Sequence, residues 1–276
     1  MNREKVKQST VKNYWEDKSP GLKHSEHDTG SEDFFTDVEK ERYSDQFKYK
    51  YLPQVAKFNS FKGKDVLEIG VGLGTDILQY AKHGANVHGI DLTENAVKLT
   101  SDRFKQNKLN GVFKTASFSK IPFKDSTFDM VYSFGVLHHS EETQEGINEV
   151  FRVLKPGGNI IIMLYHKGFK YYIRKLFLYG VLKGEFLKYS SQDIINRHSE
   201  DFGSCPMTKA YNRNEASKMF CNYDNIKFSV YRLDDNFRIF GKDISLSMFI
   251  FPKRIYRYLE NKFGWNLIIK ANKPEK

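Results

Sequence analysis

The sequence predicts an α/β fold, in which a doubly wound and mostly parallel sheet of seven strands carries helices on both faces. Short apolar runs alternate with segments of helical periodicity along residues 61–165. The first run, residues 66–69, leads directly into a turn that contains Gly70, Gly72 and Gly74. Strand–turn–helix units of this kind bind ligands at the carboxyl ends of their strands. Further strands are expected at residues 86–91, 129–134, 159–164, 226–231 and 265–269.

The spacing of the glycines favours S-adenosylmethionine over a dinucleotide as the ligand of this turn. The dinucleotide fingerprint requires glycines at its first, third and sixth positions. Counted from Gly70, the sixth position is Thr75. Glu68 stands at the end of the first strand, where a carboxylate suits the ammonium and sulfonium groups of S-adenosylmethionine, directly or through water.

A second acid is expected to bind the ribose of the same cofactor. Asp91 ends the second strand, 21 residues after Gly70. A carboxylate at this place accepts hydrogen bonds from the ribose hydroxyls in dinucleotide folds, so it does not discriminate between cofactors. The alternative is that Asp91 only caps the helix that begins near Glu94.

Five segments in the same order resemble class I S-adenosylmethionine-dependent methyltransferases, of the small-molecule branch that includes the quinone-biosynthesis enzymes. They are residues 66–76, 88–95, 121–123, 128–139 and 152–158, and they lie within residues 60–165. The resemblance implies a Rossmann-like fold and transfer of a methyl group to an O, N or C nucleophile of a small molecule, aromatic ones included. A methyltransferase acting on RNA or protein and a non-catalytic S-adenosylmethionine-binding protein are the alternatives.

One position departs from the family pattern. Family members carry an Asp that receives the adenine amino group, and the aligned residue here is Ser117. A hydroxyl still accepts a hydrogen bond, and one such bond contributes only about 1 kcal/mol, so we expect cofactor binding to survive. The expected cofactor-binding residues are Glu68, Gly70, Gly72, Gly74, Asp91, Leu92, Ser117, Phe118 and Ser133.

Catalytic candidates come from the ends of the fourth and fifth strands and from the N-terminal segment. His138 belongs to a histidine pair after the fourth strand, and Tyr165 and His166 end the fifth. His166 is placed slightly ahead as a general base, with Tyr14 as a further candidate. No metal site is expected, because His24, His27 and Asp28 lack the spacing of a closed ligand set.

The chain divides into four parts in this interpretation. Residues 1–60 form an N-terminal lid, with a helix over residues 31–58, and residues 61–165 form the cofactor-binding half. Residues 166–212 form a helical cap over the substrate, and residues 213–276 complete the core around an insertion at residues 234–263.

The composition of the chain limits the kinds of binding partner and the cellular location that we expect. The formal net charge is +10, but basic residues are interleaved with acidic ones, so a nucleic-acid partner is not favoured. No apolar run is long enough to span a membrane, and no apolar leader follows the charged start. Two cysteines without metal spacing indicate a reducing, cytoplasmic location. The apolar and basic segment 244–259 is expected to pack over the substrate site or form a homodimer seam rather than touch a membrane.

Overall fold

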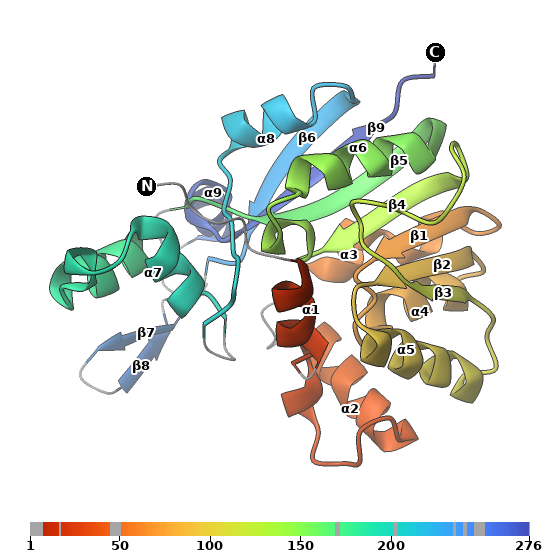
Figure 1. The fold of residues 1–276 in the computed structure, drawn as a ribbon, viewed down its shortest axis with the longest axis horizontal. Helices are drawn as coiled ribbons and strands as arrows, with labels where there is room; N and C mark the ends of the chain where they lie inside the picture. Colours follow the sequence, from red (N-terminus) through yellow and green to blue (C-terminus); the bar gives the residue numbers. More distant parts are fainter. Residues whose placement is uncertain are drawn as a thin grey trace.

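The computed structural model describes residues 8–16, 18–44, 51–168, 172–200, 204–233, 236–239, 242–245 and 252–275. Its centre is a seven-stranded sheet, as predicted (Figure 1). The strands of this sheet are β1 (Asp65–Ile69), β2 (Asn86–Asp91), β3 (Val112–Thr115), β4 (Phe128–Phe134), β5 (Leu154–Tyr165), β6 (Asp224–Tyr231) and β9 (Asn266–Asn272). The spatial order is β3-β2-β1-β4-β5-β9-β6, and β9 runs antiparallel to both of its neighbours.

Helices cover both faces of the sheet, which explains why apolar residues predominate in its central strands. One face packs against α6 (Thr143–Val153) and α8 (Arg213–Met219), and the other against α3 (Leu52–Ala56), α4 (Thr75–Lys82) and α5 (Glu94–Gln106). Leu67 and Ile69 of β1 belong to the first core, and Val66 belongs to the second. The alternation along β1 therefore serves two apolar layers.

The strand order reverses between β1 and β4, and this reversal positions the site. The chain winds outward from β1 to β3 and then returns to the other side through β4 and β5. The loops that leave β1 and β4 therefore diverge, and a crevice opens at the carboxyl ends of these two strands.

The N-terminal region differs from the single helix expected over residues 31–58. The structure has α1 (Gln8–Glu16), α2 (Glu32–Tyr43) and α3, and residues 45–50 lie outside the described part of the chain. The Ser31 hydroxyl accepts a hydrogen bond from the Phe34 amide at 3.1 Å and so caps α2. Phe34 is fully buried, so α2 is anchored to the core by its apolar face.

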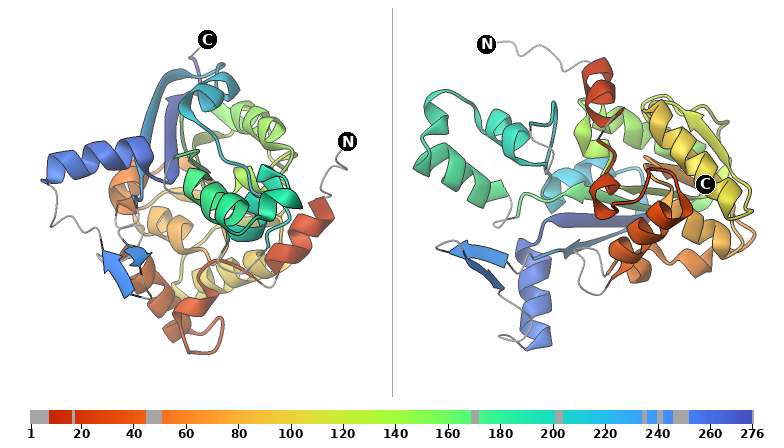
Figure 2. Two further views of the ribbon diagram at one scale, coloured as in Figure 1. Left: turned by 90° about the vertical axis from the view of Figure 1, so that its left-hand side faces the viewer. Right: turned by 90° about the horizontal axis from the view of Figure 1, so that it is seen from below.

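The cap projects from one end of the sheet (Figures 1 and 2). It contains a π-helix (Leu176–Leu182), a short turn (Glu185–Leu187) and α7 (Ser191–His198). Ile173, Phe177 and Leu178 of its first apolar segment are exposed, and a place of the cap over the substrate stays a prediction. The fully buried Ile194 and Ile195 of α7 provide the apolar interior of the cap instead.

The predicted insertion separates β6 from β9. It contains a hairpin of β7 (Asn236–Ile239) and β8 (Lys242–Ser245), followed by α9 (Lys253–Phe263). Of the segment 244–259, residues 246–251 lie outside the described residues. In α9, Tyr256 is buried while Ile255 and Tyr258 are exposed, so α9 rests on the core along one side.

Candidate functional site

The glycine-rich turn adopts a backbone that only glycine follows without strain. Gly70 has a φ of 81°, and a Cβ atom there would lie 2.2 Å from Cγ2 of Val136. Gly72 has a φ of 52°, but the position of its missing Cβ has no atom within 4 Å. A side chain at Gly72 would therefore enter open space beside the turn, which is the space a ligand needs.

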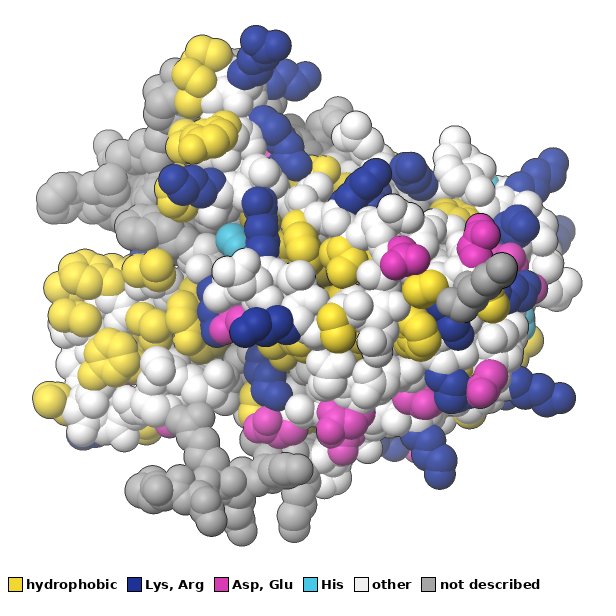
Figure 3. Space-filling view, turned by 90° about the horizontal axis from the view of Figure 1, so that it is seen from above, with side chains coloured by type: hydrophobic (Ala, Val, Ile, Leu, Met, Phe, Trp, Pro, Cys, Tyr) yellow, Lys and Arg dark blue, Asp and Glu magenta, His cyan; other side chains and the backbone are white. Residues whose placement is uncertain are grey.

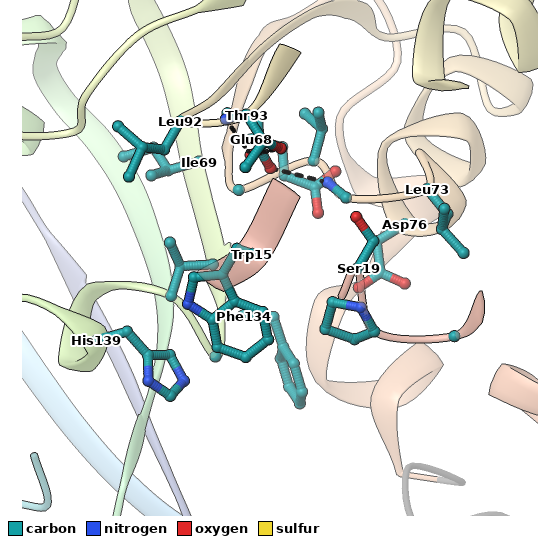
Figure 4. Close-up of a pocket in the computed structure, with 18 of the residues that line it drawn as sticks. Trp15, Ser19, Glu68, Ile69, Leu73, Asp76, Leu92, Thr93, Phe134 and His139 are labelled. Carbon is teal, nitrogen blue, oxygen red and sulfur yellow. Dashed lines mark hydrogen bonds between the residues drawn. The ribbon is translucent and has the colours of Figure 1, made fainter. Parts of the chain in front are cut away.

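This space belongs to a cavity of about 340 Å³ at the carboxyl ends of the central strands. The loops after β1, β2 and β4 form its floor, and α1 and the residues that follow it form its roof (Figure 4). Residues from both parts of the chain point into it, including Trp15, Ser19, Ile69, Leu92, Phe134 and His139.

Glu68 lines the cavity, as predicted, and it is a buried acid with one oxygen that accepts no hydrogen bond from the described residues. Only 4% of the residue is exposed, and its Oε2 atom has no hydrogen-bond partner among the described residues. Burial, and then the negative charge of Asp76, raise the pKa of Glu68 well above its usual value. A bound cation would offset both costs, so Glu68 suits a cationic ligand.

Asp76, beside Glu68, already has its partners within the protein. It accepts hydrogen bonds from Nε of Arg42 at 2.7 Å, from Tyr43 at 2.7 Å and from Tyr132 at 2.8 Å. Burial alone would raise its pKa, but Arg42 and the two hydroxyl groups hold the pKa of Asp76 below its usual value. This cluster joins α2 to the start of α4, and no pattern in the sequence indicated it.

Asp91 also lines the cavity, and it organises the turn around it. One of its oxygens accepts from the Gly72 amide at 3.1 Å, and the other accepts from the Thr93 amide at 3.0 Å and hydroxyl at 2.8 Å. Burial raises the pKa of Asp91. The alternative, that it only caps a helix, is wrong, because Thr93 occupies the cap position of α5. A role toward a ribose remains a prediction.

Ser117 and Phe118 line the end of the cavity near α1. The Ser117 hydroxyl is hydrogen-bonded to the Gln8 amide group and lies 2.8 Å from the hydroxyl of Ser119. Phe118 packs against Gly146, whose missing Cβ would lie 2.4 Å from its ring. The two residues are placed as expected, and their roles toward adenine remain predictions.

Two of the expected cofactor-binding residues are absent from the described lining of the cavity. Ser133 is fully buried, and its hydroxyl donates to the Ile69 carbonyl at 3.2 Å, so it joins β4 to β1. Gly74 begins α4, and a Cβ there would lie 3.0 Å from Thr100. Gly74 therefore allows α4 and α5 to pack closely.

Three of the catalytic candidates also lie away from the described cavity wall. His138 is fully buried, its ring lies 3.8 Å from that of Tyr165, and burial holds its pKa well below the usual value. His166 donates from Nδ1 to the Gly264 carbonyl at 3.0 Å and so joins β5 to the chain before β9. Tyr14 faces Lys18, which lies 4.3 Å from its ring.

The fourth candidate, Tyr165, does line the cavity, together with His139 and Glu200. The Tyr165 hydroxyl donates to Oε1 of Glu200 at 3.1 Å, and Nε2 of His139 lies 3.9 Å from the same oxygen. Glu200 follows α7, so this is the point at which the cap reaches the site. The histidine pair indicated His139, but nothing in the sequence around Glu200 distinguished it from a surface acid.

The tautomer of His139 follows from its surroundings. Its Nδ1 atom lies 3.0 Å from the Met207 carbonyl, which only accepts hydrogen bonds, so Nδ1 carries the proton. Burial lowers the pKa of His139, although Glu200 opposes this effect. At neutral pH the ring is therefore uncharged and Nε2 carries a lone pair, and the ring centre of His139 lies 5.0 Å from that of Trp15.

Comparison with known proteins agrees with this geometry. Residues 67–162 match the family model described as a methyltransferase domain. Phosphoethanolamine N-methyltransferase 2 of Caenorhabditis elegans is 32% identical over 53% of this chain and 35% of its own length. A ubiquinone biosynthesis O-methyltransferase of Coxiella burnetii is 28% identical over 50% of this chain and 56% of its own.

Residues 67–162 form a methyltransferase domain. The family match covers β1 to β5 and the crevice between them, whereas the cap and α9 lie outside it. A solved structure of phosphoethanolamine N-methyltransferase 2 from Haemonchus contortus shares the fold, with a TM-score of 0.59 and 18% identity over 96% of this chain and 60% of that one. The chain thus spans about a third to a half of the length of the curated relatives named above.

Proposed function

We propose that this protein transfers a methyl group from S-adenosylmethionine to a nucleophile of a small molecule. The observation that carries the proposal is Glu68, a buried acid that lines the cavity together with Gly72 and whose Oε2 atom lacks a hydrogen-bond partner among the described residues. A cation held against Glu68 would place its remaining atoms in the open space at Gly72.

The residues present fit this cofactor. Glu68 would hold the ammonium group of the methionine part of the cofactor. The turn at Gly70 and Gly72 would leave room for the cofactor against the backbone, and Asp91 would accept hydrogen bonds from the ribose hydroxyls. Ser117 and Phe118 would contact the adenine. S-adenosylmethionine supplies an activated methyl group on a sulfonium, and the protein has to align a nucleophile with that group and exclude water.

The acceptor end of the site would be formed by His139, Tyr165 and Glu200. Nε2 of the neutral His139 would take the proton of an O or N nucleophile, and Glu200 stabilises the imidazolium that results. Tyr165 holds Glu200 in place through its hydroxyl. Trp15 and Phe134 would exclude water from the same space.

The shape of the site supports a small substrate. The roof formed by α1 and the cap residues Ser199 and Glu200 encloses the cavity, and aromatic side chains line it. The relatives named above act, by their names, on phosphoethanolamine and in ubiquinone biosynthesis. We infer a small molecule with an ionisable O–H or N–H group, used in metabolism.

A reducing location is part of the proposal. Cys205 is a buried free thiol and Cys221 an exposed one, which fits a cytoplasmic protein. None of the described helices is long and apolar enough to cross a membrane.

The test is calorimetric titration of the protein with S-adenosylhomocysteine, followed by a screen of metabolites with labelled S-adenosylmethionine. Gly72→Val should abolish binding while circular dichroism stays unchanged, because the new side chain fills the open space. Gly63→Val is the matched control, since Gly63 also has a positive φ of 71° and open space but lies outside the described cavity wall. Binding by the Gly72 variant, or tight binding of NAD, would contradict the assignment.

A further inference from the structure

The cap carries a surface that the proposed function does not use. Seven of the ten exposed large apolar side chains in the described part of the chain lie within residues 173–187. Leu187 is 90% exposed and Leu182 is 64% exposed. We name this group the cap tip, and it consists of Ile173, Phe177, Leu178, Val181, Leu182, Phe186 and Leu187.

The local backbone explains why these side chains face outward together. In the π-helix, the Lys183 amide donates to the Leu178 carbonyl at 3.1 Å, so residues five apart share one side. Phe177 and Leu182 have this spacing. Phe186 folds back over Gly180, where a Cβ would lie 2.2 Å from its ring. The tip is thus one surface made of two consecutive segments, and Figure 3 shows exposed hydrophobic side chains gathered at this end of the molecule.

The charge around the cap tip is positive. Residues 172–198 contain five Lys and Arg residues against two acids. One of these acids, Glu185, lies 3.0 Å from Nε2 of His198 and 3.8 Å from Nε of Arg197, so its charge faces its own neighbours. Lys183 and Lys188 are exposed beside the apolar side chains.

We propose that the cap tip docks the protein on the surface of an anionic lipid bilayer. Exposed apolar side chains enter the boundary between headgroups and acyl chains, and lysines beside them attract anionic headgroups. A second copy of the chain is a poorer occupant, because each copy carries a net charge of +10 and a positive cap. The proposal concerns where the enzyme works and stands independently of its reaction.

Co-sedimentation of the full chain with lipid vesicles tests the proposal. The protein should pellet with vesicles of phosphatidylcholine and phosphatidylglycerol, and roughly tenfold less with phosphatidylcholine alone. Added salt should weaken the binding. The double variant Phe177→Asp and Leu187→Asp should lose binding, and Lys183→Glu with Lys188→Glu should lose the preference for anionic lipid.

The matched control is Val112→Asp on β3, since Val112 is 45% exposed. The edge strand β3 is separated in the sheet from β5, the strand that leads into the cap, by β2, β1 and β4. This variant should pellet like the unaltered chain. Absence of vesicle binding, or equal binding by the double variant with an unchanged circular dichroism spectrum, would overturn the proposal. A dimer seen by light scattering and lost in the double variant would assign the cap tip to a second copy instead.

Discussion

At the scale of single residues, the proposed proton transfer depends on the tautomer of His139. The Met207 carbonyl fixes the proton on Nδ1, and burial keeps the ring uncharged at neutral pH. His138, although adjacent, faces the core and has no polar partner among the described residues. His139, the proposed base, therefore reaches the cavity, whereas the imidazole of the adjacent His138 packs against Tyr165.

We expect His139→Gln to lower kcat about 10²–10⁴-fold at neutral pH, because the proton acceptor is lost. In the unaltered enzyme, kcat/KM should fall as the pH drops through the pKa of His139, which lies below 6.5. The loss in the variant should shrink at high pH, where the substrate ionises without help. A pH–rate profile measures both effects.

The control for this profile is His83→Gln, because His83 is exposed at the end of α4. An unchanged kcat in His139→Gln would show that alignment and exclusion of water suffice, and would remove the general base from the mechanism.

A second expectation at this scale concerns Glu68. Its pKa in the folded protein is raised, so the carboxylate forms only as the pH rises through that value. Affinity for S-adenosylhomocysteine, which retains the ammonium, should therefore increase as the pH rises through the pKa of Glu68. Glu68→Gln should weaken binding by about 1.5–3 kcal/mol at neutral pH and remove this dependence.

Calorimetry at several pH values measures this dependence, and Glu145→Gln on the exposed side of α6 serves as the control. If Glu68→Gln binds as tightly as the unaltered protein at every pH, the ammonium does not meet Glu68.

At the scale of elements, α1 forms the roof of the cavity through a few polar contacts. Nζ of Lys12 lies 2.9 Å from Oε1 of Glu94, and the Glu16 carboxylate accepts from the Asn95 amide at 3.0 Å. Val11 and Tyr14 bury its apolar side. These contacts join α1 to the start of α5, directly after the cofactor acid Asp91.

The two tryptophans of the chain, Trp15 on α1 and Trp265 before β9, both line the cavity. In a Trp265→Phe variant, emission from Trp15 should change when S-adenosylhomocysteine binds, because α1 becomes more buried. Amide exchange along α1 should slow at the same time. Fluorescence titration and hydrogen exchange measure the two effects.

Removal of residues 1–16 should then lower turnover more than cofactor affinity, since Trp15 closes the acceptor end. Unchanged emission together with normal turnover of the truncated chain would show that α1 is not a lid.

At the scale of the whole molecule, one buried cation joins the N-terminal region to the core. The Arg103 side chain is 1% exposed, and its Nη2 atom lies 2.6 Å from Oε2 of Glu39 on α2. It also donates to the Leu73 carbonyl at 3.1 Å and to the Thr75 hydroxyl at 2.8 Å. The glycine-rich turn, α2 and α5 are thus held by one side chain.

Arg103→Ala should destabilise the folded protein by about 1–3 kcal/mol, because the Leu73 carbonyl and the Thr75 hydroxyl lose their donor, whereas Glu39 keeps Lys82 and Gln79. Urea unfolding followed by circular dichroism measures the change. Lys105→Ala is the control, since the Lys105 side chain is 78% exposed and should change stability little. Equal stability of the two variants would show that the Arg103 contacts are dispensable and that the apolar side of α2 and the Arg42–Asp76 contact suffice to dock it.

The sequence by itself determined the part of the molecule that depends on local pattern. The strands β1, β2 and β4 and the cofactor side of the site were predicted from apolar runs, turn glycines and acids at strand ends. Such patterns are local, because the periodicity of a strand or helix is recognised from residues close together in the sequence. Glu68 and Asp91 reached the cavity because the carboxyl ends of parallel strands share one edge of the sheet.

Only the tertiary structure decided the acceptor side and the cap. Glu200 meets Tyr165 and His139 through contacts 35 to 61 residues apart in the chain, and no local pattern reports such a contact. His138 and His139 are identical residues, and the turn after β4 alone decides which one faces the cavity. The apolar side chains of residues 173–187 face outward whereas Ile194 and Ile195 of α7 are buried, and only packing in three dimensions distinguishes these two segments.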